Sequence, residues 1–164
     1  MLRFLVVFAC AYGVLEGLYF ILPDDFLRNV VYHRSIISVS ADLIRLITPG
    51  EPVAAHANIL RSGPVALEVV RGCDGAGAAF LLIAAIAAYP ARLSRKLVGV
   101  AIALALTWLL NEMRVVGLFY LATRHAPWFL PVHIYLAPTL VIALSCIAFA
   151  WWTALAAARR NATF

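Results

Sequence analysis

The sequence predicts an all-α integral membrane protein with about four transmembrane helices, an extracytoplasmic amphipathic helix and a short β-hairpin. Of its 164 residues, 65% are hydrophobic and only 13% are charged. The mean hydropathy is +0.95. Soluble chains are about half apolar and about a quarter charged, so this composition excludes a soluble enzyme. It also excludes intrinsic disorder, and three cysteines are too few for a disulfide-rich secreted scaffold.

Four apolar stretches predict the membrane spans, at about residues 4–22, 75–89, 97–122 and 134–157. A spanning helix needs about 20 apolar residues because the hydrocarbon layer is about 30 Å thick. The second stretch is short. Backbone in lipid must satisfy its own hydrogen bonds, so each stretch is expected to be helical. We expect the first to be a retained span, because its apolar run continues well past the cleavage-like Ala9-Cys10-Ala11. Residues 1–164 are expected to form one membrane domain.

The basic residues predict the topology. The net charge is +5, but no basic patch or aromatic-interleaved stripe is present, so no nucleic-acid partner is expected. By the positive-inside rule, the basic residues that flank the spans are cytoplasmic: Arg3, Arg92, Arg95, Lys96, Arg159 and Arg160. Four crossings then place residues 23–72, and the short link containing Arg124 and His125, outside the cytoplasm.

The long outer segment carries its own pattern. Apolar residues recur at roughly helical intervals between Phe26 and Ile47, which predicts an amphipathic helix on the membrane or protein surface. Thr48-Pro49-Gly50 ends it. Residues 53–60 and 65–70 read as two strands of a hairpin around residues 61–64, leading directly to Cys73.

Three chemically distinctive side chains are expected at the outer face. Cys73 stands where the second span begins and His133 where the fourth begins, while Arg114 lies in the third, nearer its outer end. An arginine inside a membrane costs a few kcal/mol unless it is paired or hydrated, so it is a functional-site candidate by default. Asn111 lies one turn deeper on the same helix face, and Glu112 is nearby on another.

A thiol and an imidazole are the minimum for cysteine nucleophilic catalysis. The thiolate attacks a carbonyl, and the imidazole removes the thiol proton and later protonates the leaving amine. Arg114 could stabilise the oxyanion or hold a substrate carbonyl. Asp74 is a natural helix N-cap, although its charge opposes ionisation of the neighbouring Cys73 thiol.

Each candidate also has a structural alternative. Cys73 could be a small interfacial residue, His133 a boundary residue, and Arg114 a packing partner of Glu16 or Glu112. Glu16 could equally support the site near His133. The other two cysteines and the remaining histidines show no catalytic or zinc-binding pattern, so neither a metal nor a cofactor is expected.

Three short motifs together resemble the signature of the exosortase/archaeosortase family: Gly72-Cys73-Asp74-Gly75 opening a span, Asn111-Glu112-Met113-Arg114 in the next, and His133 opening the last. The resemblance implies a membrane-embedded cysteine peptidase or transpeptidase, with Cys73 as the nucleophile, His133 as general acid/base and Arg114 as clamp.

The resemblance also implies the partners and the location. Substrates would be exported proteins ending in a short motif, a transmembrane segment and a basic tail, cleaved at the outer face of the cytoplasmic (inner) membrane. Membrane lipid is the other expected partner. Two features depart from the family pattern: Asp74 stands where many members have Ser, Thr or Asn, and the chain is short beside the longer exosortases.

Two other functional classes remain open from the residues. The first is a non-catalytic assembly or export accessory subunit in which Arg114 holds helices together. The second is a small carrier that uses Glu16 and Arg114. Neither of these functions would depend on Cys73.

Overall fold

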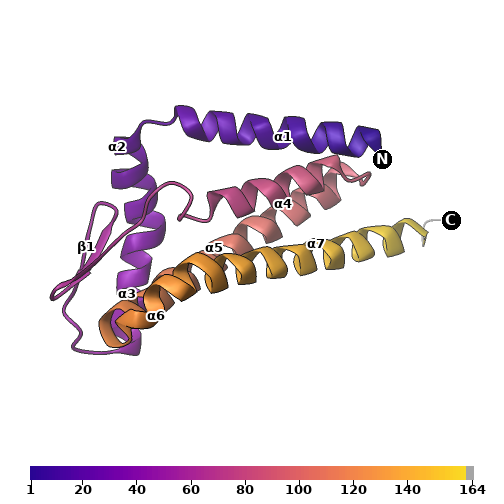
Figure 1. Cartoon of the computed structure of the whole chain (residues 1–164). Helices are drawn as coiled ribbons and strands as arrows, with labels where there is room; N and C mark the ends of the chain where they lie inside the picture. The colour runs from indigo at the N-terminus through magenta and orange to yellow at the C-terminus, as the bar shows by residue number, and fades with distance from the viewer. Residues whose placement is uncertain (162–164) are drawn as a thin grey trace. The chain divides into compact units, whose positions relative to one another are not determined.

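The protein divides into two compact units. The computed structural model describes residues 1–161, and the side chains of residues 1–157. The first unit contains Met1–Ile21, Ala76–Trp108 and the described part of residues 139–164; the second contains Leu22–Gly75 and Leu109–Pro138. The side chains of Arg159 and Arg160, which the topology prediction uses, lie outside the described residues. Figure 1 follows the chain through both units.

Apolar helices build the first unit. They are α1 (Leu2–Ile21), α4 (Ala76–Ala88), the first half of α5 (Leu93–Arg124) and most of α7 (Ala137–Asn161). Helix α1 runs along α4 (Figure 1), where the Tyr19 and Phe80 rings meet edge to face at 5.6 Å. The core of the unit joins α4, α5 and α7 through Leu82, Ile86, Ala103 and Trp152.

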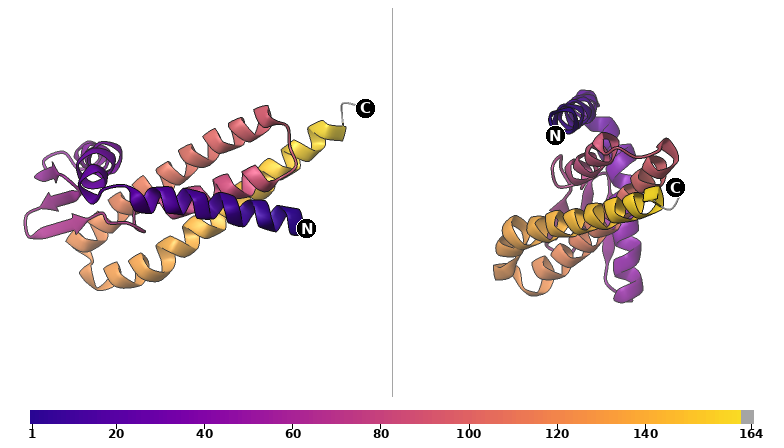
Figure 2. Two further views of the ribbon diagram at one scale, coloured as in Figure 1. Left: turned by 90° about the horizontal axis from the view of Figure 1, so that it is seen from above. Right: turned by 90° about the vertical axis from the view of Figure 1, so that its right-hand side faces the viewer.

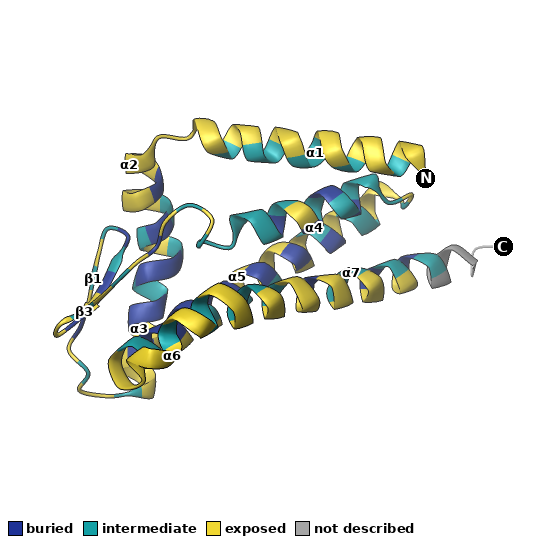
Figure 3. Ribbon diagram, viewed as in Figure 1, coloured by how far each residue is buried: buried dark blue, intermediate teal, exposed yellow. Residues whose placement is uncertain are grey.

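The membrane character of the fold is confirmed. Three helical stretches are long and apolar enough to cross a membrane, namely Leu2–Ile21, Leu93–Arg124 and Ala126–Ala157. Helix α1 contains no buried residue and is largely exposed in Figure 3. An apolar helix with this exposure is suited to contact with lipid. The segment expected to form the second span is α4, an apolar helix of only 13 residues that is not among these three stretches. At about 1.5 Å per residue, it is shorter than a full crossing.

The amphipathic helix expected in the outer segment is confirmed as a continuous helical run. It consists of α2 (Asp24–Phe26), η1 (Leu27–Ile37) and α3 (Ser38–Ile47). The buried face differs in part from the expected one, because Phe26 and Ile47 are exposed while Leu27 and Tyr32 are buried. The physical reason is that η1 winds as a π-helix, which changes the residues that share a face.

A three-stranded antiparallel sheet replaces the expected single hairpin. Strands β1 (Val53–His56), β2 (Ile59–Ser62) and β3 (Val65–Glu68) pair in that order. The expected first strand, residues 53–60, was wrong as one strand because the chain folds back at Ala57-Asn58. The Asn58 Nδ2 satisfies this turn by donating to Glu68 Oε1 at 3.0 Å and to the Val69 carbonyl at 2.8 Å.

The sheet packs on the helical run beside it, as the left view in Figure 2 shows. The His33 Nδ1 lies 3.1 Å from the Ala57 carbonyl, and Arg45 donates to the Val53 carbonyl at 2.8 Å. Leu60 is fully buried. This packing provides the apolar face that a small sheet needs for stability.

The last helical stretch begins earlier than expected. Helix α6 (Ala126–Pro131), η2 (Val132–Leu136) and α7 follow without a break, whereas the sequence placed the start near residue 134. His125 alone separates this stretch from α5. Pro127 favours the early start, because a proline in the first turn of a helix removes no intrahelical hydrogen bond.

Candidate active site

The second unit contains five of the six predicted site residues. They are Cys73, Asp74, Asn111, Arg114 and His133. The sixth, Glu16, belongs to the first unit, where its Oε1 accepts a hydrogen bond of 2.8 Å from the hydroxyl of Tyr12, one turn earlier in α1. The five residues come from three stretches of chain far apart in the sequence.

Cys73 lies in a tight loop that is bounded by two glycines. Gly72 and Gly75 have φ angles of +82° and +83°, in the left-handed region that L-residues rarely adopt. The Cys73 N–H donates to the Val70 carbonyl at 2.9 Å, which closes the turn. Its thiol is free and partly buried, and Asp74 beside it is also partly buried. The two glycines of the Gly-Cys-Asp-Gly motif therefore suit the backbone conformation of this loop.

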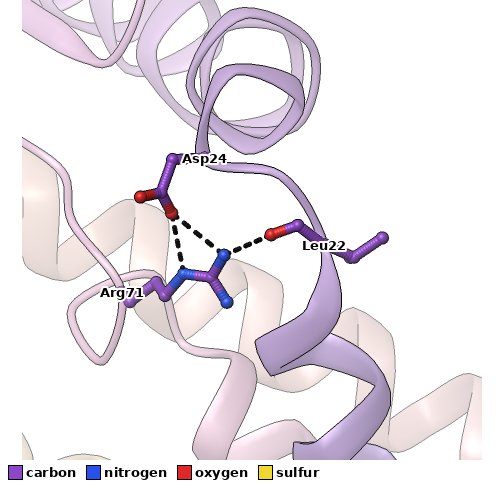
Figure 4. Close-up of polar contacts among 3 residues, drawn as sticks. All are labelled: Leu22, Asp24 and Arg71. Atoms are coloured by element: carbon purple, nitrogen blue, oxygen red, sulfur yellow. Dashed lines mark hydrogen bonds and ion pairs between the residues drawn. The ribbon is translucent and has the colours of Figure 1, made fainter.

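Arg71 anchors the loop to the start of the amphipathic helix. Its Nε and Nη2 donate to Asp24 Oδ1 at 3.1 and 2.9 Å, and Nη2 also donates to the Leu22 carbonyl (Figure 4). A planar guanidinium suits this arrangement because its donors are held in a fixed fork. The contact links the residue two positions before Cys73 to a segment 47 residues away in sequence.

Asn111 brings α5 against the Cys73 loop. A Cβ placed on Gly75 would lie only 3.1 Å from the Asn111 Cβ, so the loop backbone and this side chain are in close contact. Asn111 is 3% exposed. Neither its Nδ2 nor its Oδ1 has a hydrogen-bond partner among the described residues. A buried carboxamide with two unused groups is rare in folded proteins and calls for an explanation.

Arg114 and His133 both belong to the second unit, Arg114 on α5 and His133 in η2. The Arg114 Nε and the His133 Nδ1 are both buried without hydrogen-bond partners in the described structure. The His133 ring also stacks on Phe129, with centroids 5.5 Å apart and an interplanar angle of 9°.

The backbone around His133 is unusual in its winding. His133 lies in η2, a five-residue π-helical segment between Pro131 and Ala137. Short π-helical segments inside longer helices often occur at functional sites. The sequence offered a signal for this segment, since Pro131 and Pro138 bracket it and each lacks a backbone donor.

Ser40 is a contributor that sequence reasoning missed. Its hydroxyl donates to Glu112 Oε2 at 2.7 Å, and the two residues are 0% and 1% exposed. The suggested partnership of Glu112 with Arg114 is not formed; instead Glu112 joins α5 to α3. The second carboxyl oxygen of Glu112 has no partner within the described residues. No sequence pattern linked residues that are 72 positions apart.

The site therefore holds a thiol, an imidazole, a guanidinium and a carboxamide in one unit. No hydrogen bond joins the Cys73 thiol to the His133 ring in the part of the chain that is described. Catalytic hydrogen bonds are often long without substrate and shorten when the substrate is bound. Cys10 and Cys146 are exposed in the first unit. Within the described residues, no group of three or more His, Cys, Asp or Glu side chains could hold a metal ion.

Comparison with known proteins identifies the family. No curated protein and no protein of solved structure matches the chain. A family model described as transmembrane exosortase matches residues 2–152, which include the Cys73 loop, the Asn111 to Arg114 motif and His133. This match covers most of the 164 residues. The chain therefore belongs to the transmembrane exosortase family.

Proposed function

We propose that this protein is a membrane-embedded cysteine peptidase or transpeptidase that cleaves C-terminal sorting signals of exported proteins. The observation that carries the proposal is the family match over residues 2–152, which spans the whole candidate site. The geometry supports it, because Asn111, Arg114 and His133 each keep a buried polar atom without a partner. Such atoms are expected where a substrate completes the hydrogen bonding.

Cys73 is the nucleophile in this proposal, and His133 is the general acid/base. The imidazole takes the thiol proton, and the thiolate sulfur bonds to the carbonyl carbon of the scissile peptide. The carbonyl oxygen then carries negative charge, which Arg114 stabilises with its fixed donors. Collapse of this intermediate breaks the C–N bond, and the imidazolium gives its proton to the leaving amine.

The N-terminal product remains on Cys73 as a thioester. Water or an acceptor amine attacks the thioester carbon and loses a proton to His133, and the Cys73 sulfur leaves. Attack by water gives hydrolysis, and attack by an amine gives transfer. Both outcomes use the same three side chains.

Asn111 holds the substrate backbone in this mechanism. Its Nδ2 can donate to a peptide carbonyl and its Oδ1 can accept from a peptide N–H. Contact with Gly75 brings this carboxamide beside the loop that carries Cys73. Asp74 and Glu16 have supporting roles in this proposal. Asp74 helps to shape the same loop, and Glu16 supports the first unit, where it accepts the hydrogen bond from Tyr12.

The substrate reaches the site through the membrane. Its own transmembrane helix docks laterally against the apolar helices, so that its motif meets Cys73 and its basic tail lies on the cytoplasmic side. The active site then faces outward from the cytoplasmic membrane.

Substitution of the three cysteines tests the proposal. The protein is co-expressed with an exported protein that ends in a motif, a span and a basic tail, and conversion is followed by gel mobility. Cys73→Ser is expected to lower conversion by several orders of magnitude, because the nucleophile is lost. Arg114→Lys is expected to lower it by about 10²- to 10³-fold, since the charge remains but the fork of donors is lost.

Cys10→Ser and Cys146→Ser are the matched controls, and both are expected to retain activity. Equal membrane levels of each variant are verified by immunoblot. If Cys73→Ser converts the substrate normally, the peptidase assignment fails and a non-catalytic assembly subunit is favoured. Loss of function on Glu16→Gln with Cys73 irrelevant would instead indicate a carrier.

A further inference from the structure

A cationic cavity lies in the first unit, in a different part of the chain from the candidate active site. Its volume is about 410 Å³, and four basic side chains from two segments of the chain line it: Arg3, Arg92, Arg95 and Lys96. No acidic residue is among its described lining residues. The positive-inside rule requires cations on one side of the membrane, but it does not require them to converge on one cavity.

Two of the cations are held in place by neutral groups. Arg95 Nη1 donates to the Ala156 carbonyl at 2.8 Å, and Lys96 Nζ donates to the Ala87 carbonyl at 2.5 Å. These contacts hold the two side chains at the wall of the cavity. Arg3 and Arg92 are exposed, and neither side chain forms an ion pair or hydrogen bond with another described residue. The cavity therefore carries a concentrated positive charge with donors free to bind an anion.

A second cavity adjoins the first and has the opposite character. Its volume is about 400 Å³, and it shares Arg95 and Ala156 with the cationic cavity. Most of its wall is apolar and aromatic, formed by Val98, Ile102, Trp151, Trp152 and Leu155. A charged cavity joined at Arg95 to an apolar one matches a molecule with an anionic head and a hydrocarbon chain.

We propose that these two cavities form one binding site for an anionic phospholipid. The phosphate occupies the cationic cavity, where arginine donors bind its oxygens in pairs. One acyl chain occupies the apolar cavity between α5 and α7. The cations stand near the ends of apolar helices, which is the level of lipid headgroups in a bilayer. A free phosphate would use the cationic cavity but leave the apolar one without a role.

Lipid binding to the purified full chain tests this site. The protein in detergent is titrated with phosphatidylglycerol, and retained lipid is counted by native mass spectrometry. The Arg3→Gln/Arg92→Gln variant is expected to bind this lipid roughly 30-fold more weakly, since each cation near a lipid surface contributes about fivefold. Both side chains lack partners within the described residues, so the fold should be preserved; Arg92→Gln alone serves if the double variant misfolds.

Arg28→Gln/Arg61→Gln is the matched control, because it removes the same charge from exposed positions in the second unit. It is expected to bind phosphatidylglycerol as the unsubstituted protein does. Equal weakening by both double variants would overturn the site. Three further titrations separate the possible ligands. Phosphatidylcholine has acyl chains but no net charge and is expected to bind more weakly than phosphatidylglycerol; equal binding would overturn the role of the cations. Glycerol 3-phosphate and inorganic phosphate carry the anionic group without an acyl chain. If either chain-free phosphate binds as tightly as phosphatidylglycerol, the ligand is a free phosphate and the lipid assignment is wrong.

Discussion

Two glycines control the position of the candidate nucleophile. Gly72 and Gly75 flank Cys73-Asp74, and both adopt positive φ angles. They differ in their surroundings. A Cβ on Gly72 would meet no atom within 4 Å, whereas one on Gly75 would meet Asn111 at 3.1 Å. Backbone conformation and packing against α5 can therefore be tested separately.

Gly75→Ala is expected to reduce both stability and substrate conversion more than Gly72→Ala does. Each substitution strains a left-handed residue by about 1–2 kcal/mol. Gly75→Ala also pushes the loop away from Asn111, which displaces Cys73. Thermal unfolding in detergent and substrate conversion measure the two effects. Equal effects of the two variants on conversion would show that contact with Asn111 does not position the nucleophile.

The roles of Cys73, Arg114 and His133 remain predictions. They were selected because Cys73 and His133 stand where spans begin and Arg114 lies inside one, where a charged side chain is rare. The contact between Gly75 and Asn111 was not predicted, although both residues had been noted. A glycine motif indicates a special backbone conformation, but it does not indicate which side chain will lie against it.

At the scale of elements, one buried hydrogen bond joins α3 to α5. Ser40 donates to Glu112 at 2.7 Å where both side chains are almost fully buried. Because Ser40 lies on the amphipathic helix and Glu112 on α5, this contact helps to fix the two helices side by side. Arg114 follows Glu112 by two residues on the same helix. Farther along, the Tyr120 hydroxyl on α5 lies 2.7 Å from the hydroxyl of Thr48, the residue that follows the end of α3.

Ser40→Ala is expected to lower the free energy of unfolding by about 1–3 kcal/mol, because the buried Glu112 carboxyl then loses its only hydrogen bond among the described residues. Ser38→Ala is the control. Ser38 lies two residues before Ser40 in α3 and is only half-buried, so its replacement should change stability by less than about 0.5 kcal/mol. Thermal or denaturant unfolding in detergent compares the two. Equal losses would mean that the Ser40–Glu112 bond contributes nothing specific.

The elements themselves were predicted unevenly. A helix from Phe26 to Ile47 was expected, but part of its buried face was not, because π-helical winding shifts the periodicity that the pattern assumed. The turn at Ala57-Asn58 was also missed. Ala57 has a φ of +48° without being glycine, and its neighbour Asn58 makes side-chain hydrogen bonds that only the folded sheet provides.

At the scale of the whole molecule, the charge distribution predicts the orientation in the membrane. An impermeant maleimide applied to intact cells is expected to label Cys73 in a chain carrying Cys10→Ser and Cys146→Ser. We expect this because the positive-inside rule places the basic link at residues 92–96 in the cytoplasm and the Cys73 loop on the opposite side of the membrane.

The control for this labelling moves the only cysteine to that link. A chain carrying Ser94→Cys and lacking the three native cysteines should resist labelling until the cells are permeabilised; Ser94 is exposed. If the Ser94→Cys chain is labelled in intact cells and Cys73 is protected, the predicted orientation is wrong and the protein has the opposite one.

The sequence alone determined that this is a helical membrane protein, where its apolar helices lie, and in what order its thiol, guanidinium and imidazole occur. These features depend on composition and local periodicity, which are properties of the linear chain. Only the tertiary structure decided that Asn111 meets the Cys73 loop, that Ser40 binds Glu112, and that four cations surround one cavity. Such contacts depend on where helices cross and how they are rotated, and small shifts in winding change which side chains meet.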